Sequence, residues 1–213
     1  MCLQDYPNRL WEVFQLYSTP LTCHYILMVD GAITLFPRFG LRRVDALLLT
    51  HDHADACFGL DDLRSLTLQG TFAPVQDHVS IYTSPETHAA ISNMFPYMVD
   101  SSKATGGGDI PSFVWHQFEP SETFTIHTCG DIRVMPLPVE HGMYFASKPP
   151  KPYMCMGFRI GDVSYVSDAN RIPEETKRKI EGSKVLILDA LRERPHASHF
   201  SFDEVCFGMM MTS

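Results

Sequence analysis

Apolar runs along the chain alternate with turn residues, and this pattern predicts a mixed α/β protein. Residues 44–49 (VDALLL) form the first clear apolar run and predict a buried strand. Behind this strand, apolar residues recur at helical spacing: Cys57, Leu60 and Leu63. We therefore expect a strand, a loop and a helix, in that order.

A second strand and a second helix are predicted in the next part of the chain. Residues 79–84 (VSIYTS) alternate as a strand does. Ser84 and Pro85 then offer an N-cap and a first-turn proline, so we expect a helix that runs to about Met98. The following residues 101–109 (SSKATGGGD) predict a flexible loop.

Two β-hairpins are predicted in the second half of the chain. Residues 122–142 contain two β-rich runs around a turn at 129–131 (Cys-Gly-Asp), and the second run ends at His141. Residues 154–170 repeat this form, with a turn at 161–162 (Gly-Asp). Each hairpin thus ends close to a residue that can bind a metal.

The second of these hairpins ends at Asp168, and a helix and a strand follow it. Residues 172–182 begin with a proline and end with a glycine, as a surface helix does. Residues 184–190 predict a buried strand that ends in Asp189. Residues 147–152 (SKPPKP) predict a loop and not a domain linker.

Composition limits the class of protein. The chain has 213 residues, 45% hydrophobic and 20% charged, which predicts one soluble globular domain over residues 1–213. We expect no secretory leader and no membrane span, and hence a cytoplasmic protein. The six cysteines form no C-x-x-C pair, which argues against a zinc ribbon and a disulfide framework. The net charge of −8 disfavours non-specific binding of nucleic acid.

Residues that bind metal ions stand at the ends of three predicted strands: His51, His53, His141 and Asp168. Zinc and similar ions are held by imidazole nitrogen and carboxylate oxygen. His51 and His53 point the same way in an extended segment, because they are two residues apart. Asp55 offers a ligand for a second ion, with Asp168 bridging the two. An isolated H-x-H is more often a polar surface feature, so the prediction rests on the co-occurrence of all three strand ends.

Three segments resemble the second, third and fourth metal-binding motifs of the metallo-β-lactamase fold superfamily. They are LLLTHDHADACFGLDDLR (47–64), PLPVEHG (136–142) and YVSDA (165–169). The branch they resemble contains the cyclic-phosphate phosphodiesterase of bacterial phosphonate degradation and the tRNA 3′-end processing nucleases. Within this branch, a group of fungal and plant hydrolases carries H-A-D-A in place of H-x-D-H. Residues 53–56 (HADA) of this chain resemble that group. The resemblance covers about Phe36 to Glu204.

This resemblance implies an α/β (α+β) fold: a four-layer αββα sandwich with metals at the edge of two sheets. It implies that the first ion is held by His51, His53, His141 and Asp168, and a weaker second ion by Asp55 and Asp168. RPHASHFSFDE (194–204) resembles the H-x-[ST]-H segment of the branch, which makes His199 the candidate acid, with His196 supporting it or merely exposed. Arg64 is expected to anchor the helix rather than touch substrate.

The chain also departs from the superfamily pattern at three places. Ala56 stands where most members have a histidine on the second metal. The last ligand histidine of the superfamily has no counterpart after His199, and the glycine-rich beginning is not evident. Compared with the superfamily, the chain is therefore expected to be truncated at both ends.

Taken together, the residues and the resemblance predict a metallo-hydrolase. The expected reaction is hydrolysis of a phosphodiester or cyclic phosphate by metal-bound hydroxide, with Asp55 and His199 as catalytic residues. The metal expected is zinc, with manganese or iron as alternatives, and the substrate is a small-molecule or nucleotide phosphodiester. Two alternatives stay open: hydrolysis of a thioester or lactone on the same fold, and a truncated protein that binds metal without catalysis. A homodimer also stays open.

Overall fold

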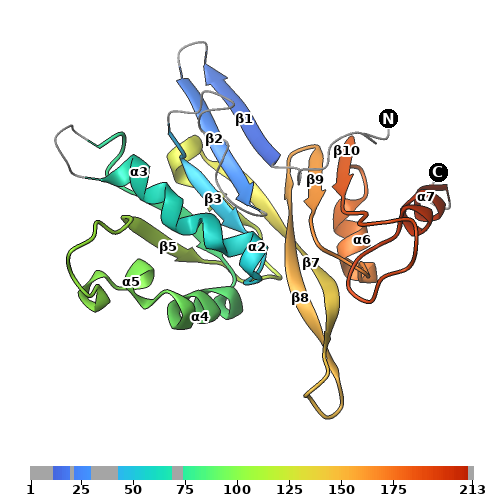
Figure 1. Cartoon of the computed structure of the whole chain (residues 1–213). Coiled ribbons are helices and arrows are strands. Elements are labelled where there is room, and N and C mark those ends of the chain that lie inside the picture. Colours follow the sequence, from blue (N-terminus) through green and yellow to red (C-terminus); the bar gives the residue numbers. More distant parts are fainter. Residues whose placement is uncertain (1–11, 20–21, 30–42, 69–73, 211–213) are drawn as a thin grey trace. The chain divides into compact units, whose positions relative to one another are not determined.

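The computed structural model describes residues 12–19, 22–29, 43–68 and 74–210 (Figure 1). The chain divides into two compact units, and each carries a sheet of its own. Unit 1 comprises Met1–Phe118 and Ile126–Asp131, and unit 2 comprises Glu119–Thr125 and Ile132–Ser213. Residues 25–31 (YILMVDG) superficially offer Asp30 for the Asp-x-Gly turn near the beginning of the superfamily's fold, and Asp30 lies outside the described residues.

Unit 1 holds a five-stranded sheet in the order β1-β2-β3-β4-β5. Its strands are β1 Glu12–Thr19, β2 Thr22–Val29, β3 Ala46–Leu49, β4 Val79–Thr83 and β5 Phe113–Gln117. β1 is antiparallel to β2, whereas β2, β3, β4 and β5 are each parallel to the next. The four residues of β3 are apolar and buried, as expected for a strand between two parallel neighbours. The strands predicted around 44–49 and 79–84 are thus confirmed.

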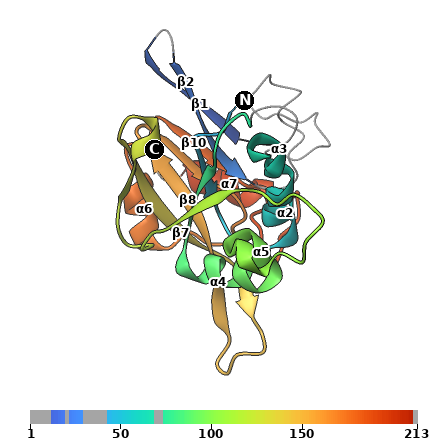
Figure 2. The same cartoon turned by 90° about the vertical axis from the view of Figure 1, so that its left-hand side faces the viewer.

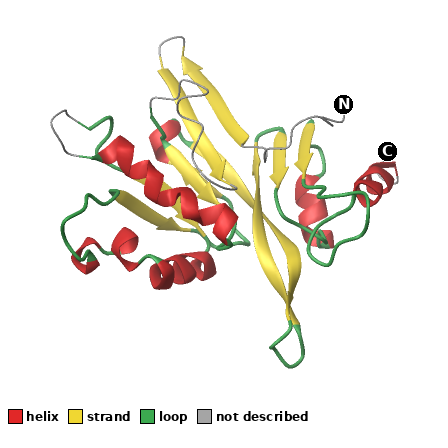
Figure 3. Ribbon diagram, viewed as in Figure 1, coloured by secondary structure: helices red, strands yellow, loops and turns green. Residues whose placement is uncertain are grey.

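Helical segments pack on the sheet of unit 1 (Figure 3). They are α2 Ala54–Cys57, η1 Phe58–Leu63, α3 Arg64–Thr67, α4 Pro85–Met94 and α5 Pro96–Val99. Two short 3₁₀ turns, η2 Ser101–Lys103 and η3 His127–Cys129, do not contribute to this core. The apolar residues at helical spacing do form a shared core: Cys57, Leu60 and Leu63 pack with Leu47 and Leu49 of β3. The helix predicted behind β3 is therefore present, but its middle part is a 3₁₀ helix.

The helix that begins after Ser84 is shorter than predicted. The Ser84 hydroxyl accepts a hydrogen bond from the Thr87 backbone N–H at 3.2 Å, which confirms the predicted N-cap. The helix stops at Met94 because proline at 96 forces the preceding residue, Phe95, out of the helical conformation. A separate turn, α5, then follows.

The second sheet, which belongs to unit 2 apart from Ile126 in β6, has the order β10-β9-β8-β7-β6. Its strands are β6 Phe124–Ile126, β7 Ile132–Tyr144, β8 Lys151–Ile160, β9 Val163–Val166 and β10 Val185–Leu188, and the helices of unit 2 are α6 Glu174–Ile180 and α7 Phe202–Met210. β7, β8 and β9 form an antiparallel meander, and β10 is parallel to β9. The predicted hairpin turns contain glycines of positive φ, Gly130 at 82° and Gly161 at 58°.

Three strand ends in unit 2 differ from the prediction. β10 ends at Leu188 rather than at Asp189, and its residues are exposed or half-buried rather than buried. β7 does not end at His141 but continues to Tyr144, and the pairing with β8 shifts register between Glu140 and Met143. His141 thus lies at a bulge, a feature that redirects a side chain within a strand. β9 ends at Val166, so Asp168 lies in the loop after the strand.

Across the described residues, no helix combines the length and the apolar character that a bilayer crossing requires.

Candidate metal centre

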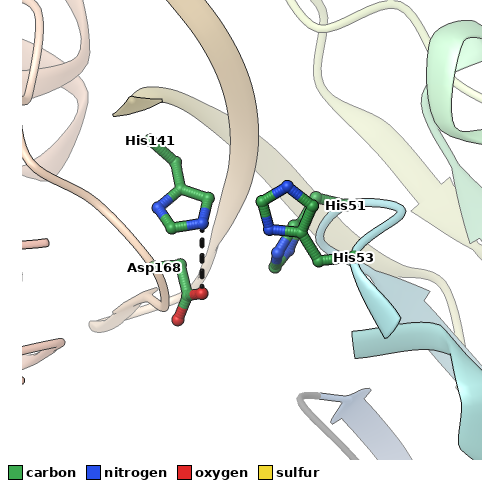
Figure 4. Close-up of side chains that lie close together, drawn as sticks. All are labelled: His51, His53, His141 and Asp168. Atoms are coloured by element: carbon green, nitrogen blue, oxygen red, sulfur yellow. Dashed lines mark ion pairs between the residues drawn. The ribbon is translucent and has the colours of Figure 1, made fainter. Parts of the chain in front are cut away.

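In unit 1, the two histidines of the H-x-H segment stand directly after β3. The imidazole of His51 is buried, and its Nδ1 lies 2.9 Å from the Thr50 hydroxyl. The His53 ring is exposed and meets the His51 ring edge-on, with centroids 4.6 Å apart (Figure 4). When the Thr50 hydroxyl accepts from Nδ1–H, the lone pair of His51 stands on Nε2. The two histidines therefore lie side by side, as predicted from their spacing.

In unit 2, His141 is held by the backbone of a distant loop. Its Nδ1 lies 2.6 Å from the carbonyl oxygen of Ser198. Because a carbonyl only accepts, Nδ1 carries the proton of the neutral ring and Nε2 carries the lone pair. That Nε2 lies 3.3 Å from Oδ2 of Asp168 (Figure 4). Both side chains are largely buried.

His199 repeats this arrangement on the same carboxylate. Its Nδ1 donates to Oδ2 of Asp189 at 2.7 Å, and its Nε2 lies 3.9 Å from Oδ2 of Asp168. One ligand atom from each of these three residues lies within 4.8 Å of the others. The His199 ring also meets the His141 ring edge-on, with centroids 4.8 Å apart. In unit 2, the Nε2 atoms of His141 and His199 therefore face the same oxygen, Oδ2 of Asp168.

The chemistry of this cluster suits a divalent cation. With Nδ1–H donated outward, each Nε2 presents a lone pair to an oxygen that also carries lone pairs. Such atoms repel each other unless a proton or a metal ion lies between them. Imidazole nitrogen and carboxylate oxygen are zinc ligands, and an acceptor on the other ring nitrogen is the usual support for a ligand histidine. The residues present therefore fit a divalent metal.

The Asn170 side chain ties the loops of this cluster together. Its Oδ1 accepts from the Gly142 backbone N–H at 3.1 Å, and its Nδ2 donates to the Ala197 carbonyl at 2.8 Å. It thereby links the bulge after His141 to the loop that carries His199. Gly142 has φ of 84°, and a Cβ at this position would lie 3.1 Å from Cβ of Ser198.

The other predicted residues occupy varied positions. Asp55 is partly buried on α2, and its role stays a prediction. Ala56 is fully buried and offers no ligand atom. Arg64 pairs with Asp61 at 2.8 Å within the helical segment, which supports the anchoring role. The His196 ring lies 5.1 Å from the His199 ring.

The thiol of Cys57 is not a ligand in its ordinary state. Burial, with smaller contributions from Asp52 and Asp55, raises its pKa to about 11. The group is therefore a neutral thiol near pH 7, whereas metal binding and nucleophilic attack require the thiolate.

Sequence reasoning missed three residues that support the cluster: Asp189, Asn170 and Ser198. Asp189 was predicted as a strand end, but nothing in the sequence linked it to His199. Ser198 acts through its backbone carbonyl, which leaves no signal in residue type. A hint existed for Asn170, since asparagine side chains in turns often hydrogen-bond to backbone groups.

A family model described as the Beta-lactamase superfamily domain matches residues 31–207. The chain belongs to this superfamily. The predicted mixed α/β class, with sheets flanked by helices, agrees with the metallo-β-lactamase fold.

Three solved structures illustrate what this chain is similar to. A diphosphatase of the PhnP family has 25% identity and a TM-score of 0.69, over 89% of this chain and 66% of that chain. Zn²⁺-bound PqqB from Methylobacterium extorquens has 19% identity and a TM-score of 0.53, over 87% and 60%. Unliganded yeast PDE1 has 14% identity and a TM-score of 0.60, over 79% and 52%. The last two show the fold alone.

Among curated proteins, an octanoyltransferase from Porphyromonas gingivalis (strain ATCC BAA-308 / W83) is 25% identical over 166 residues. The match covers 78% of this chain but 29% of that protein. The chain therefore spans less than a third of this relative's length.

Proposed function

We propose that this superfamily member hydrolyses a phosphodiester or cyclic phosphate with a divalent metal. The observation that carries the proposal is the convergence of His141 and His199 on one oxygen of Asp168. Each imidazole has its Nδ1–H held by an acceptor, as in histidines that bind metal. The similarity to a diphosphatase at 25% identity supports chemistry at phosphorus.

In this proposal, the ligands are assigned from the metal-binding motifs of the sequence. The residues assigned to the first ion are His51, His53, His141 and Asp168, and those assigned to a weaker second ion are Asp55 and Asp168. A bound divalent ion lowers the pKa of a water and polarises a phosphoryl oxygen. Zinc suits the nitrogen-rich set, and manganese and iron remain alternatives.

Three side chains are assigned further roles in this reaction: Asp55, His199 and Asp189. Asp55 orients the attacking water. When both ring nitrogens of His199 carry a proton, its Nε2–H is donated to the leaving oxygen while Nδ1–H stays on Asp189. Asp189 holds the His199 ring through Nδ1, which keeps Nε2 turned toward Asp168. Asp189 is thus a positioning residue.

Metal content and phosphodiesterase activity of the same purified samples test the proposal. We expect about one zinc, manganese or iron ion per chain, and turnover of bis(p-nitrophenyl) phosphate. His141→Ala and Asp168→Ala should lose both the ion and the turnover, because each removes a ligand.

His127→Ala is the matched control. His127 is an exposed histidine that pairs with Asp131 at 2.7 Å on the turn after β6. This variant should keep metal and activity. Full metal content in His141→Ala, or a metal-loaded wild type that cleaves no phosphodiester, contradicts the proposal.

Hydrolysis of a thioester or lactone is the second candidate. The name of the curated relative, an octanoyltransferase, points to acyl chemistry, although the match covers only part of that protein. A side-by-side assay on an octanoyl thioester and on bis(p-nitrophenyl) phosphate separates the two reactions. A faster reaction with the thioester favours this candidate.

Finer assignments remain proposals. We place the chain in the branch of the cyclic-phosphate phosphodiesterases and tRNA 3′-end processing nucleases, because GLDDLR (59–64) follows the histidine motif. A cytoplasmic location, a nucleotide or small-molecule substrate and a homodimer also stay predictions.

A further inference from the structure

The hairpin of β7 and β8 extends past the other strands of its sheet (Figure 1 and Figure 2). Near its tip, Tyr144 pairs directly with Lys151, and Tyr153 lies two residues further along β8. Directly opposed residues and residues two apart share a face of a hairpin. We call Tyr144, Lys151 and Tyr153 the aromatic face.

Ring contacts connect the aromatic face to the candidate metal centre within unit 2. The centroids of His141 and Tyr153 are 5.9 Å apart, and those of Tyr153 and Tyr144 are 5.3 Å apart. The ammonium of Lys151 lies 5.3 Å from the centroid of Tyr144. A continuous series of side chains therefore leads from a candidate ligand to a half-exposed ring beside a positive charge.

The opposite face of the hairpin differs in chemistry. It carries Met143 and Met154, which are 39% and 40% exposed, with Pro152 between them. Tyr144 is similarly exposed, at 46%. Because Met143 and Tyr144 are similarly exposed but differ in chemistry, a substitution at Met143 is a control for a substitution at Tyr144.

A half-exposed tyrosine ring next to an ammonium suits a ligand that is both planar and anionic. Aromatic rings stack on nucleobases and other planar rings, and a lysine attracts a phosphate or carboxylate. On a chain with a net charge of −8, an anion needs such a local positive group. The position next to His141 relates the face to the substrate rather than to a remote partner.

We propose that the aromatic face binds the planar organic part of the substrate. The class of substrate is a nucleotide or aryl phosphate ester, whose ring lies on Tyr144 and whose further negative charge lies at Lys151. This inference rests on the proposed function, since it places the reacting phosphate at the centre that contains His141.

Equilibrium binding tests the inference without any turnover. The probes are adenosine 5′-monophosphate and ribose 5-phosphate, which share the sugar phosphate and differ in the base. Titration calorimetry on the purified full chain should show adenosine monophosphate binding about tenfold more tightly or better, as stacking on an aromatic side chain gives. Tyr144→Ala should abolish this preference, and Tyr144→Phe should keep it.

Two further variants sharpen the result. Lys151→Ala should weaken both probes only slightly and to a similar extent, because the single phosphate of each probe lies at the centre with His141 and Lys151 attracts it from a distance. Met143→Ala, on the opposite face, should leave both affinities unchanged.

An unchanged preference in Tyr144→Ala overturns the inference, as does an equal loss in Tyr144→Ala and Met143→Ala or a wild type that does not distinguish the probes. Failure of the proposed function is a separate observation: no phosphodiester is cleaved, whatever the outcome of binding.

Discussion

The histidines of unit 1 and those of unit 2 are positioned in different ways. His51 follows a buried parallel strand, and the group on its Nδ1 is the neighbouring Thr50. His141 instead depends on the carbonyl of Ser198, and His199 on the carboxylate of Asp189. Local sequence thus places one pair, while contacts between distant loops place the other. We expect the second arrangement to be the more sensitive to substitution.

The largest effect is expected from Asp168→Asn. This change keeps the shape of the side chain but removes the charge that two imidazoles face. Because a metal ion contributes several kcal/mol to transition-state stabilisation, phosphodiesterase activity should fall by about a thousandfold or more. Steady-state kinetics with elemental analysis measures this loss. A metal-loaded variant with wild-type rates would show that the carboxylate is not a ligand.

The next prediction compares the hydrogen bonds that hold the candidate ligand histidines of unit 2 with those that hold His51 in unit 1. Asn170→Ala breaks both loop contacts, to Gly142 and Ala197, and should lower metal affinity by about 10- to 100-fold. Thr50→Val removes one hydroxyl beside His51, while β3 still positions the ring, so the loss should stay at the lower end of that range. Competition with a chelator measures both affinities. Equal losses would contradict the distinction between local and long-range support.

A smaller effect is expected on folding stability at Gly142. Gly142→Ala places a Cβ at positive φ and 3.1 Å from Ser198 Cβ, which should destabilise the fold by about 1–3 kcal/mol. Gly161→Ala has a positive φ of 58° but open space around the new Cβ, so it should cost about 1 kcal/mol. Urea unfolding measures both free energies. A larger cost at Gly161 would contradict the role given to the Ser198 contact.

The smallest effect concerns pH and the start of α7. Hydrogen bonds from Ser201 lower the pKa of Glu204 below its usual value. A depressed folded pKa means that the carboxylate stabilises the fold above its unfolded pKa, and that this contribution is lost as the pH falls through the folded pKa. Glu204→Gln should therefore lower the free energy of unfolding at pH 7 and leave it nearly unchanged at acidic pH. Urea unfolding at both pH values tests this, and a cost independent of pH would refute it.

Local features of the sequence predicted the structure well. The apolar run at 46–49 gave a buried strand, and Ser84 with Pro85 gave a helix start, because both depend on adjacent residues. The stop at Phe95 also has a local cause, because Pro96 disfavours the helical conformation of the residue before it. Helix α7 was not predicted, although Ser201 and Glu204 have the spacing of a capping box and make its hydrogen bonds.

The supports of the candidate site were not predictable in the same way. Ser198 contacts His141 across 57 positions of sequence, and Asn170 reaches Ala197 across 27. Such contacts depend on how the loops of unit 2 fold against each other, which residue type and spacing do not encode. The bulge that carries His141 belongs to the same class, since it is defined by pairing with β8.

The convergence of two imidazole lone pairs on Asp168 also bears on how the chain responds to metal supply. When neither a proton nor a cation lies between these atoms, the folded chain holds their lone pairs close together, whereas the unfolded chain does not. An ion that binds only the folded chain relieves the repulsion between them and raises stability with the logarithm of its free concentration. The melting temperature of the protein would then report metal availability, and metal-starved copies would be the first to be unfolded and degraded.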